Sequence, residues 1–169
     1  MPSFVEDLLE IADSLVQPGG PGRPRQAPLR RAVSTAYYAV FNRLSETCAD
    51  TLIGWSKPWE VFTPIYRSVD HDRALAVLSE RNSQKKHPLG DEIERVGVIF
   101  RALQAAREWA DYSPEPHPDP FETLAGRRFS REQATQLVAN AREAIALIDN
   151  LGVEARLVLV TRLIAKQRR

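Results

Sequence analysis

The stretch that decides the fold is residues 29–48, LRRAVSTAYYAVFNRLSETC. Its apolar residues recur at steps of three and four, the spacing that places side chains on one face of an α-helix. They are Leu29, Val33, Ala36, Tyr37, Val40, Leu44 and Cys48. A second series steps by four along a neighbouring face and comprises Arg30, Ser34, Tyr38 and Asn42. The stretch predicts a helix of about 20 residues, starting at Pro28, with a buried apolar stripe.

Five other segments carry helical patterns and helix-start signals. Ser3 and Glu6 form a capping box, as do Ser130 and Gln133, and Thr63 is the expected cap before Pro64. The predicted helices cover residues 3–17, 64–80, 91–112, 130–150 and 153–166. Each predicted helix has one side that is expected to be buried. In residues 3–17 this side carries Phe4, Leu8, Ile11 and Leu15, and in residues 64–80 it carries Leu75 and Leu78. It carries Ile93, Val96, Phe100, Leu103, Ala106 and Ala110 in residues 91–112, Leu137, Ala141, Ala144, Ile145 and Ile148 in residues 130–150, and Leu157, Val160 and Ile164 in residues 153–166.

Proline and glycine mark the connections between these helices. Two clusters, within residues 18–28 and 114–120, cannot be helix interior and predict loops. Weaker breaks are expected at residues 54–64, 82–90 and 150–152, and no pattern predicts a sheet. The fold class is therefore all-α: an up-and-down bundle of four to five helices in residues 1–151, followed by an extra C-terminal helix with a basic tail in residues 152–169.

Composition indicates a globular protein and says little about its chemistry. The 169 residues carry 23 Lys plus Arg and 22 Asp plus Glu, a formal charge of +1. No apolar run approaches the ~20 residues of a membrane span, and the acidic residues near the start do not fit a signal peptide. The single cysteine, Cys48, cannot form an internal disulfide. We therefore expect a soluble, cytoplasmic protein with no membrane association.

The sequence lacks the motifs of several enzyme and cofactor classes. It has no glycine-rich phosphate loop, no Cys/His ligand set and no Gly-x-Ser-x-Gly elbow. We expect neither a metal nor a cofactor. His117 lies in the second proline cluster and is expected at the surface, and His71, between Asp70 and Asp72, is expected to be solvated or structural.

The end of the segment 91–112 is the most unusual spot. Arg107 and Asp111 are four residues apart, so both side chains project from one helix face and can form an ion pair. Arg107 borders the apolar stripe and should be partly buried, which requires such a partner. Two interpretations stay open: a structural clamp with Tyr112 packed beside it, or a guanidinium and a phenol that line a groove for a phosphate.

Several segments of the sequence, including these residues, resemble those of a known protein family. Residues 31–42, centred on AYYAVF, resemble the second helix of HEPN-domain proteins. Residues 103–114, with Arg107, Ala110, Asp111 and Tyr112, resemble the Arg-x-x-Ala-Asp-Tyr signature of one HEPN branch. Residues 66–71 and the capped segment 130–150 are also similar to that branch. The resemblance covers about residues 29–148, most of the chain.

The resemblance implies a helical bundle, usually a homodimer and often prokaryotic. Many HEPN proteins are metal-independent ribonucleases of toxin–antitoxin and defence systems, with an arginine and a later histidine that are separated by four to six residues. Arg107 matches that arginine, but positions 112–114 are Tyr, Ser and Pro. We therefore expect no catalytic residue there, and a binding or regulatory module that engages RNA, a nucleotide or a cognate antitoxin-like protein. Its expected binding residues are Arg107, Asp111 and Tyr112, with Tyr38 as a neighbour.

Alternatives to this binding module remain. The protein could be a ribonuclease toxin that uses Arg107 with Tyr112, or Arg81 with His87, so whether it is an enzyme stays open. Arg81 and His87 are six positions apart in a run that contains Lys85 and Lys86, which would attract phosphate. The run is also typical of a solvated basic loop between helices. A third possibility is a structural partner of a nucleotidyltransferase-like antitoxin.

Overall fold

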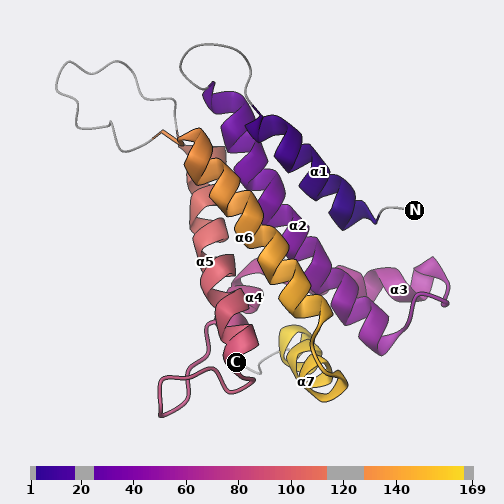
Figure 1. Cartoon of the computed structure of the whole chain (residues 1–169). Coiled ribbons are helices and arrows are strands. Elements are labelled where there is room, and N and C mark those ends of the chain that lie inside the picture. The colour runs from indigo at the N-terminus through magenta and orange to yellow at the C-terminus, as the bar shows by residue number, and fades with distance from the viewer. Residues whose placement is uncertain (1–2, 18–24, 114–127, 166–169) are drawn as a thin grey trace. The chain divides into compact units, whose positions relative to one another are not determined.

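The computed structural model is all-helical in the residues it describes, which are 3–17, 25–113 and 128–165 (Figure 1). The described helices are α1 (Phe4–Val16), α2 (Gln26–Leu52), α3 (Trp59–Tyr66), α4 (His71–Leu78), α5 (Asp91–Tyr112), α6 (Arg131–Asp149) and α7 (Val153–Ile164). These residues contain no strand, and the expected all-α helical bundle is confirmed. None of these helices is both long enough and apolar enough to cross a membrane.

The chain divides into two compact units. The first unit comprises residues 1–39 and 102–141, and the second comprises residues 40–101 and 142–169. Because these boundaries fall inside α2, α5 and α6, each of the three long helices contributes one part to each unit.

The first unit is an up-and-down arrangement of four helical segments. The first part of α2 runs antiparallel to α1 and to the last part of α5, and α6 begins in the direction opposite to α5 (Figure 1). Such alternation lets each segment bury one apolar stripe against its neighbours. The buried side chains include Val5, Leu9, Leu29, Val33, Leu103 and Val138.

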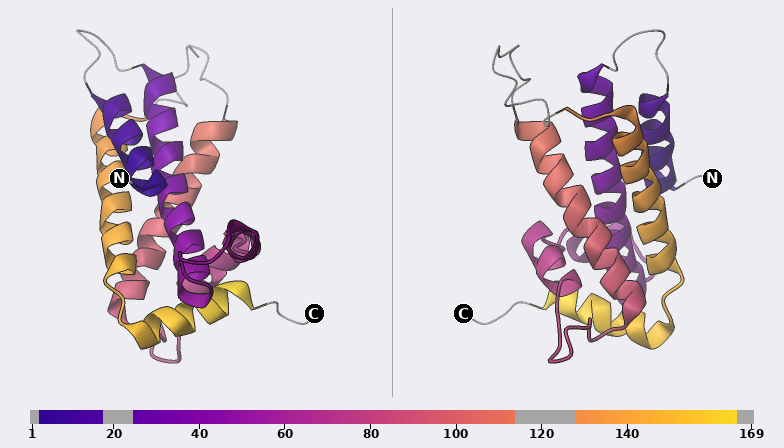
Figure 2. Two further views of the ribbon diagram at one scale, coloured as in Figure 1. Left: turned by 90° about the vertical axis from the view of Figure 1, so that its right-hand side faces the viewer. Right: turned by 60° about the vertical axis from the view of Figure 1, so that its left-hand side comes forward.

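The second unit combines the remaining parts of the long helices with α3, α4 and α7. Within it, α7 runs across the direction of α6 rather than along it (Figure 2). The two helices α4 and α7 contact each other, since Arg73 Nε donates to the Arg162 carbonyl at 2.9 Å. Arg162 also forms an ion pair with Glu80.

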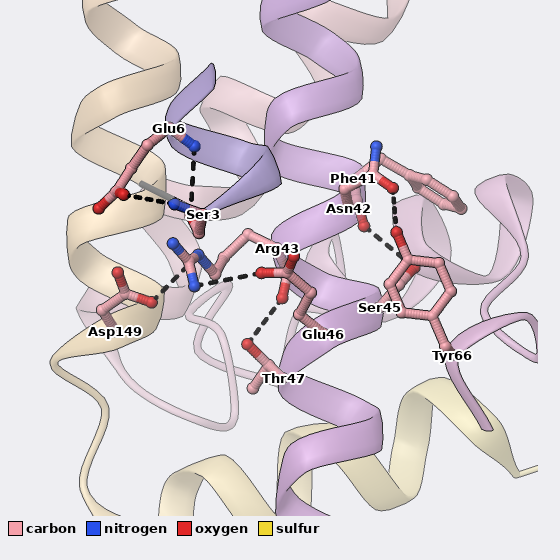
Figure 3. A network of polar contacts seen from close by, with 10 residues as sticks. All are labelled: Ser3, Glu6, Phe41, Asn42, Arg43, Ser45, Glu46, Thr47, Tyr66 and Asp149. Carbon is pink, nitrogen blue, oxygen red and sulfur yellow. Dashed lines mark hydrogen bonds and ion pairs between the residues drawn. The ribbon is translucent and has the colours of Figure 1, made fainter. Parts of the chain in front are cut away.

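A polar network on α2 supports the second unit (Figure 3). The Arg43 guanidinium lies 3.2 Å from the buried Glu46 carboxylate and 3.4 Å from Asp149 on α6. On another side of α2, the Tyr66 hydroxyl donates to Asn42. Burial, and secondarily the charge of Glu46, raise the pKa of Tyr66 above its usual value, so this hydroxyl keeps its proton.

The apolar stripe predicted for residues 29–48 is confirmed in full. All seven of its members are buried: Leu29, Val33, Ala36, Tyr37, Val40, Leu44 and Cys48. The helix is longer than expected, because it begins before Pro28 and continues to Leu52. Proline fits there because it lies in the first turn, where its missing amide has no intrahelical acceptor. Burial raises the pKa of the Cys48 thiol to about 12.

The buried face predicted for the first helix is wrong. Phe4 and Ile11 are 57% and 49% exposed, and the core instead takes the series one residue further on: Val5, Leu9, Ala12 and Val16. Both series have helical spacing, because each residue of the buried series directly follows a residue of the predicted one. The capping box of Ser3 and Glu6 is present as expected.

The single helix predicted for residues 64–80 is also wrong, because the structure has two short helices. Thr63 and Pro64 lie inside α3, which begins in the segment that was expected to be a break. The second helix, α4, starts at its own cap, where the Asp70 side chain accepts hydrogen bonds from the amides of Asp72 and Arg73. A local cap of this kind satisfies amides that a continuous helix would have bonded to its own carbonyls.

The C-terminal helix exists within the expected range, but its buried side differs in part. Val160 is buried as predicted, together with Leu159 and Leu163, whereas Leu157 is 48% exposed. Most of the first proline cluster and all of the second, including His117, lie outside the described residues. The breaks expected at residues 82–90 and 150–152 are confirmed.

Gly97 provides a test of the packing between α4 and α5 in the second unit. A Cβ atom there would lie 1.9 Å from the Leu78 carbonyl oxygen. We expect Gly97→Ala to lower the free energy of unfolding in urea by about 1–3 kcal/mol, despite alanine's better helix propensity. Gly152→Ala is the control, since a Cβ there meets nothing within 4 Å. Equal stability of both variants would contradict the close packing.

Candidate functional site

A polar ladder joins α2 to α5 within the first unit. Its rungs are formed by the side chains that step by four along α2 and by residues near the end of α5. From one end to the other, Arg30 meets Trp109 and Ser113, Ser34 meets Asp111, and Tyr38 meets Arg107. The order is that of two antiparallel helices, and the four-residue step from Ser34 to Tyr38 on α2 matches the step from Asp111 to Arg107 on α5.

Arg107 is held by one partner from each helix. Its Nη2 donates to the Tyr38 hydroxyl at 2.7 Å, and its Nε lies 3.1 Å from Asp111 Oδ2. The Nε atom is buried, and its approach to the carboxylate makes an ion pair without hydrogen-bond alignment. The side chains of Arg107 and Asp111 are 18% and 27% exposed. The guanidinium is therefore sheltered but still reaches the surface.

Three tyrosine rings surround the same guanidinium. Its Cζ lies 5.7 Å from the ring centre of Tyr37, 5.4 Å from that of Tyr38 and 5.3 Å from that of Tyr112. Aromatic rings within about 6 Å of a guanidinium attract it through their quadrupoles. Tyr37 is buried, whereas Tyr112 is 72% exposed. The cluster thus has a closed side at Tyr37 and an open side at Tyr112.

These surroundings keep Arg107 charged. Burial by itself lowers the pKa of the guanidinium. The hydrogen bond to Tyr38, together with electrostatic interactions with Tyr38, Tyr112 and Asp111, outweighs burial, and the pKa lies above its usual value. The site therefore offers a permanent cation at every physiological pH.

Ser34 orients the acidic partner. Its hydroxyl is buried and donates to Asp111 Oδ2 at 3.1 Å, the same oxygen that faces Arg107. A hydrogen bond to one carboxylate oxygen fixes the carboxylate plane, so the ion pair has a defined geometry.

Arg30 closes the ladder at the C-terminal end of α5. Its Nη1 donates to the Ser113 carbonyl at 2.6 Å, and its Cζ lies 4.7 Å from the Trp109 ring centre. The last carbonyls of a helix have no intrahelical donor and carry partial negative charge. Arg30 supplies both a hydrogen-bond donor and a positive charge to these carbonyls, so it stabilises the point where α5 ends.

The open side of the cluster can hold an anionic ligand. The contacts of Arg107 with the described residues engage Nε and Nη2, which leaves Nη1 for a ligand. The Tyr112 hydroxyl lies 3.4 Å from Nη2, and an exposed phenol can also donate its proton to a phosphate oxygen. Its ring can stack on a nucleic-acid base.

An open groove of about 420 Å³ lies on another face of α5 in the same unit. Its walls come from the last part of α5, the start of α6 and the two residues before Ser130. They are Ala106, Trp109, Arg128, Phe129, Gln133, Gln136 and Leu137. Arg107 is not among them, so the groove and the Arg107 cluster are separate features of α5.

The alternative pair, Arg81 and His87, lies in the second unit and is engaged in local structure. The His87 side chain is 3% exposed, in contrast to the exposed Lys85 and Lys86 beside it, so the run is not a wholly solvated loop. Its Nδ1 accepts from the Leu89 amide, and its Nε2 lies 2.9 Å from the Val77 carbonyl. This arrangement requires the neutral Nε2–H tautomer.

Glu94 links the two members of that pair. It accepts from the His87 amide at 3.0 Å and lies 3.6 Å from Arg81 Nη2. Both ring nitrogens of His87 are thus bound to backbone, so proton transfer to a substrate would require this loop to open. Among the described residues, no three His, Cys, Asp or Glu side chains gather closely enough to hold a metal ion.

The structure brings together all four of the binding residues expected from sequence: Arg107, Asp111, Tyr112 and Tyr38. The sequence did not indicate that Ser34, Arg30 or Tyr37 belongs to this site. The signal for the first two was present in the four-residue series on α2, because that series matches the spacing of Arg107 and Asp111 on α5. No spacing pattern in the sequence indicates the groove or the burial of His87.

Comparison with protein-family models, with curated proteins and with solved structures found no match for this chain.

A double-mutant cycle tests the geometry of the cluster. Unfolding free energies of Arg107→Gln, Tyr38→Phe and the double variant should reveal a coupling of about 1 kcal/mol. Each single variant already removes the charged hydrogen bond between the two side chains, so the double variant loses no further bond. The same cycle with Tyr112→Phe should give a coupling of less than about 0.5 kcal/mol, since that contact is long and exposed. A stronger coupling to Tyr112 than to Tyr38 would contradict the described arrangement.

Proposed function

We propose that this protein is a HEPN-like helical module that binds RNA or a nucleotide through Arg107 and Tyr112, and that it acts as a homodimer. The observation that carries this proposal is the half-sheltered guanidinium, oriented by Asp111 and Tyr38 and open beside the exposed Tyr112. A guanidinium held in this way is pre-organised, so less side-chain entropy is lost when it binds a phosphate.

Phosphate and base would be recognised by different groups of the cluster. Arg107 Nη1 and the Tyr112 hydroxyl supply donors for phosphate oxygens, and the Tyr112 ring supplies a stacking surface for a base. Asp111 limits the approach, because its carboxylate repels an anion. The ligand therefore enters from the Tyr112 side, where the surface is open.

The ribonuclease alternative remains a hypothesis with weaker chemical support. In the HEPN ribonucleases that the chain resembles, a histidine completes the motif, and the neighbour of Arg107 here is the phenol of Tyr112. Arg81 and His87 offer a histidine, but its ring nitrogens bond to the backbone. Chemistry that moves a proton needs a group able to exchange it near neutral pH. Binding without cleavage is the function that this chemistry favours.

RNA binding can be measured with a 12-nucleotide single-stranded RNA labelled with fluorescein, by anisotropy at low and moderate KCl. We expect Arg107→Gln to weaken binding about tenfold, because one charged hydrogen bond to a phosphate is lost. Tyr112→Ala should weaken it by a similar factor through loss of stacking. Intact RNA after long incubation with excess protein is expected, and its cleavage would favour the ribonuclease.

Arg95→Gln is the matched control for charge. Arg95 lies on the same helix, is exposed and pairs with Glu143, and neither residue belongs to the cluster. This control should bind RNA within about twofold of the unchanged protein, since exposed ion pairs contribute little. Equal weakening by both arginine variants would mean that net charge rather than the cluster binds RNA. Absence of binding by the unchanged protein to the oligonucleotide and to mononucleotides would refute the proposal.

A further inference from the structure

The groove beside Trp109 has the chemistry of a small-molecule site. Its volume of about 420 Å³ is within the usual range for ligand pockets, roughly 300–1,000 Å³. Ala106 and Leu137 supply aliphatic surface, and Trp109 and Phe129 supply aromatic surface. The lining is therefore mostly apolar with a few polar groups, the usual composition of such pockets.

The aromatic wall is built rigidly. The rings of Trp109 and Phe129 meet edge to face, with centres 4.8 Å apart and planes at 82°. The buried Gln26 holds Phe129 by two hydrogen bonds, to its carbonyl at 2.9 Å and from its amide at 3.0 Å. Arg30 lies over the indole of Trp109. Since each ring is fixed by a neighbour, the wall is formed before a ligand arrives.

Two glutamine side chains present opposite hydrogen-bonding groups to the groove. The Gln133 carbonyl oxygen accepts from the Ser130 amide, so its NH₂ group remains as a donor. The Gln136 NH₂ group donates to Asn140, so its carbonyl oxygen remains as an acceptor. A donor and an acceptor one helical turn apart match the polar edge of a heteroaromatic ring.

Arg128 adds a cation to this lining, and none of the described residues that line the groove carries a carboxylate. An anionic substituent on the ligand would therefore be attracted rather than repelled. We infer that this groove binds a planar heteroaromatic molecule that carries a phosphate or carboxylate group. The inference does not depend on the Arg107 cluster, which lies on another face of α5.

The tryptophans of the chain allow a direct assay. The sequence contains three, Trp55, Trp59 and Trp109. In the double variant W55F/W59F all tryptophan fluorescence comes from Trp109. We expect saturable quenching by AMP, a heteroaromatic phosphate, or by nicotinate, a non-fluorescent heteroaromatic carboxylate. Ribose 5-phosphate, which lacks an aromatic ring, should not quench.

Substitutions in the same background locate the site. Ala106→Phe fills the groove and should abolish quenching. Gln136→Leu removes the acceptor and should weaken binding about tenfold. Arg128→Gln should lower the affinity for AMP to that for adenosine, while leaving adenosine binding unchanged. Because Gln136 is exposed, its substitution keeps the test valid if Ala106→Phe fails to fold.

Two controls separate this inference from the proposed function. Arg107→Gln should leave quenching unchanged, since Arg107 does not line the groove. Arg142→Gln, an exposed arginine further along α6, should also leave it unchanged. No saturable quenching by AMP or nicotinate at millimolar concentration would overturn the inference. Quenching that survives both Gln136→Leu and Arg128→Gln would overturn it as well.

Discussion

The polar ladder between α2 and α5 is the interaction on which the first unit depends. Apolar stripes hold helices together but tolerate sliding, because one apolar contact resembles the next. Specific polar pairs do not tolerate such sliding, because a shift of one helix along the other leaves a sheltered charge without its partner. The contacts of Arg30, Ser34 and Tyr38 with α5 therefore fix how the two helices are aligned along their length. The alignment in turn places Arg107 beside three tyrosine rings.

Stability and binding place different demands on the same guanidinium. As a clamp, Arg107 needs Asp111 and Tyr38, and both are present. As a ligand site, it needs an opening and an unused nitrogen, which the exposed Tyr112 and Nη1 provide. A structural clamp and a ligand site are therefore compatible. The contacts with Asp111 and Tyr38 orient the same guanidinium whose Nη1 stays available beside Tyr112. The groove beside Trp109 gives α5 a second face with ligand-binding chemistry.

The sequence predicted the fold class and the Arg107–Asp111 pair because both depend on local spacing. The stripe on α2 repeats with helical period, and Arg107 and Asp111 are one turn apart, so their relation needs no tertiary information. The buried face of α1 was mispredicted because Phe4 and Val5 begin two equally regular apolar series. The division between α3 and α4 depends on the cap at Asp70. Tertiary contacts decide the burial of His87 and the shape of the groove, and sequence spacing does not encode them.

The central claim is that Arg107 is sheltered and held by Asp111 and Tyr38. Side-chain NMR of ¹⁵N-labelled arginine tests it most directly, through hydrogen exchange of each Nε–H with water. The Nε of Arg107 is buried, so its proton should exchange far more slowly than that of the exposed Arg101 on the same helix. The protection should also fall in Asp111→Asn. Exchange of Arg107 as fast as that of Arg101 would contradict the account, because the guanidinium would then lie freely in water.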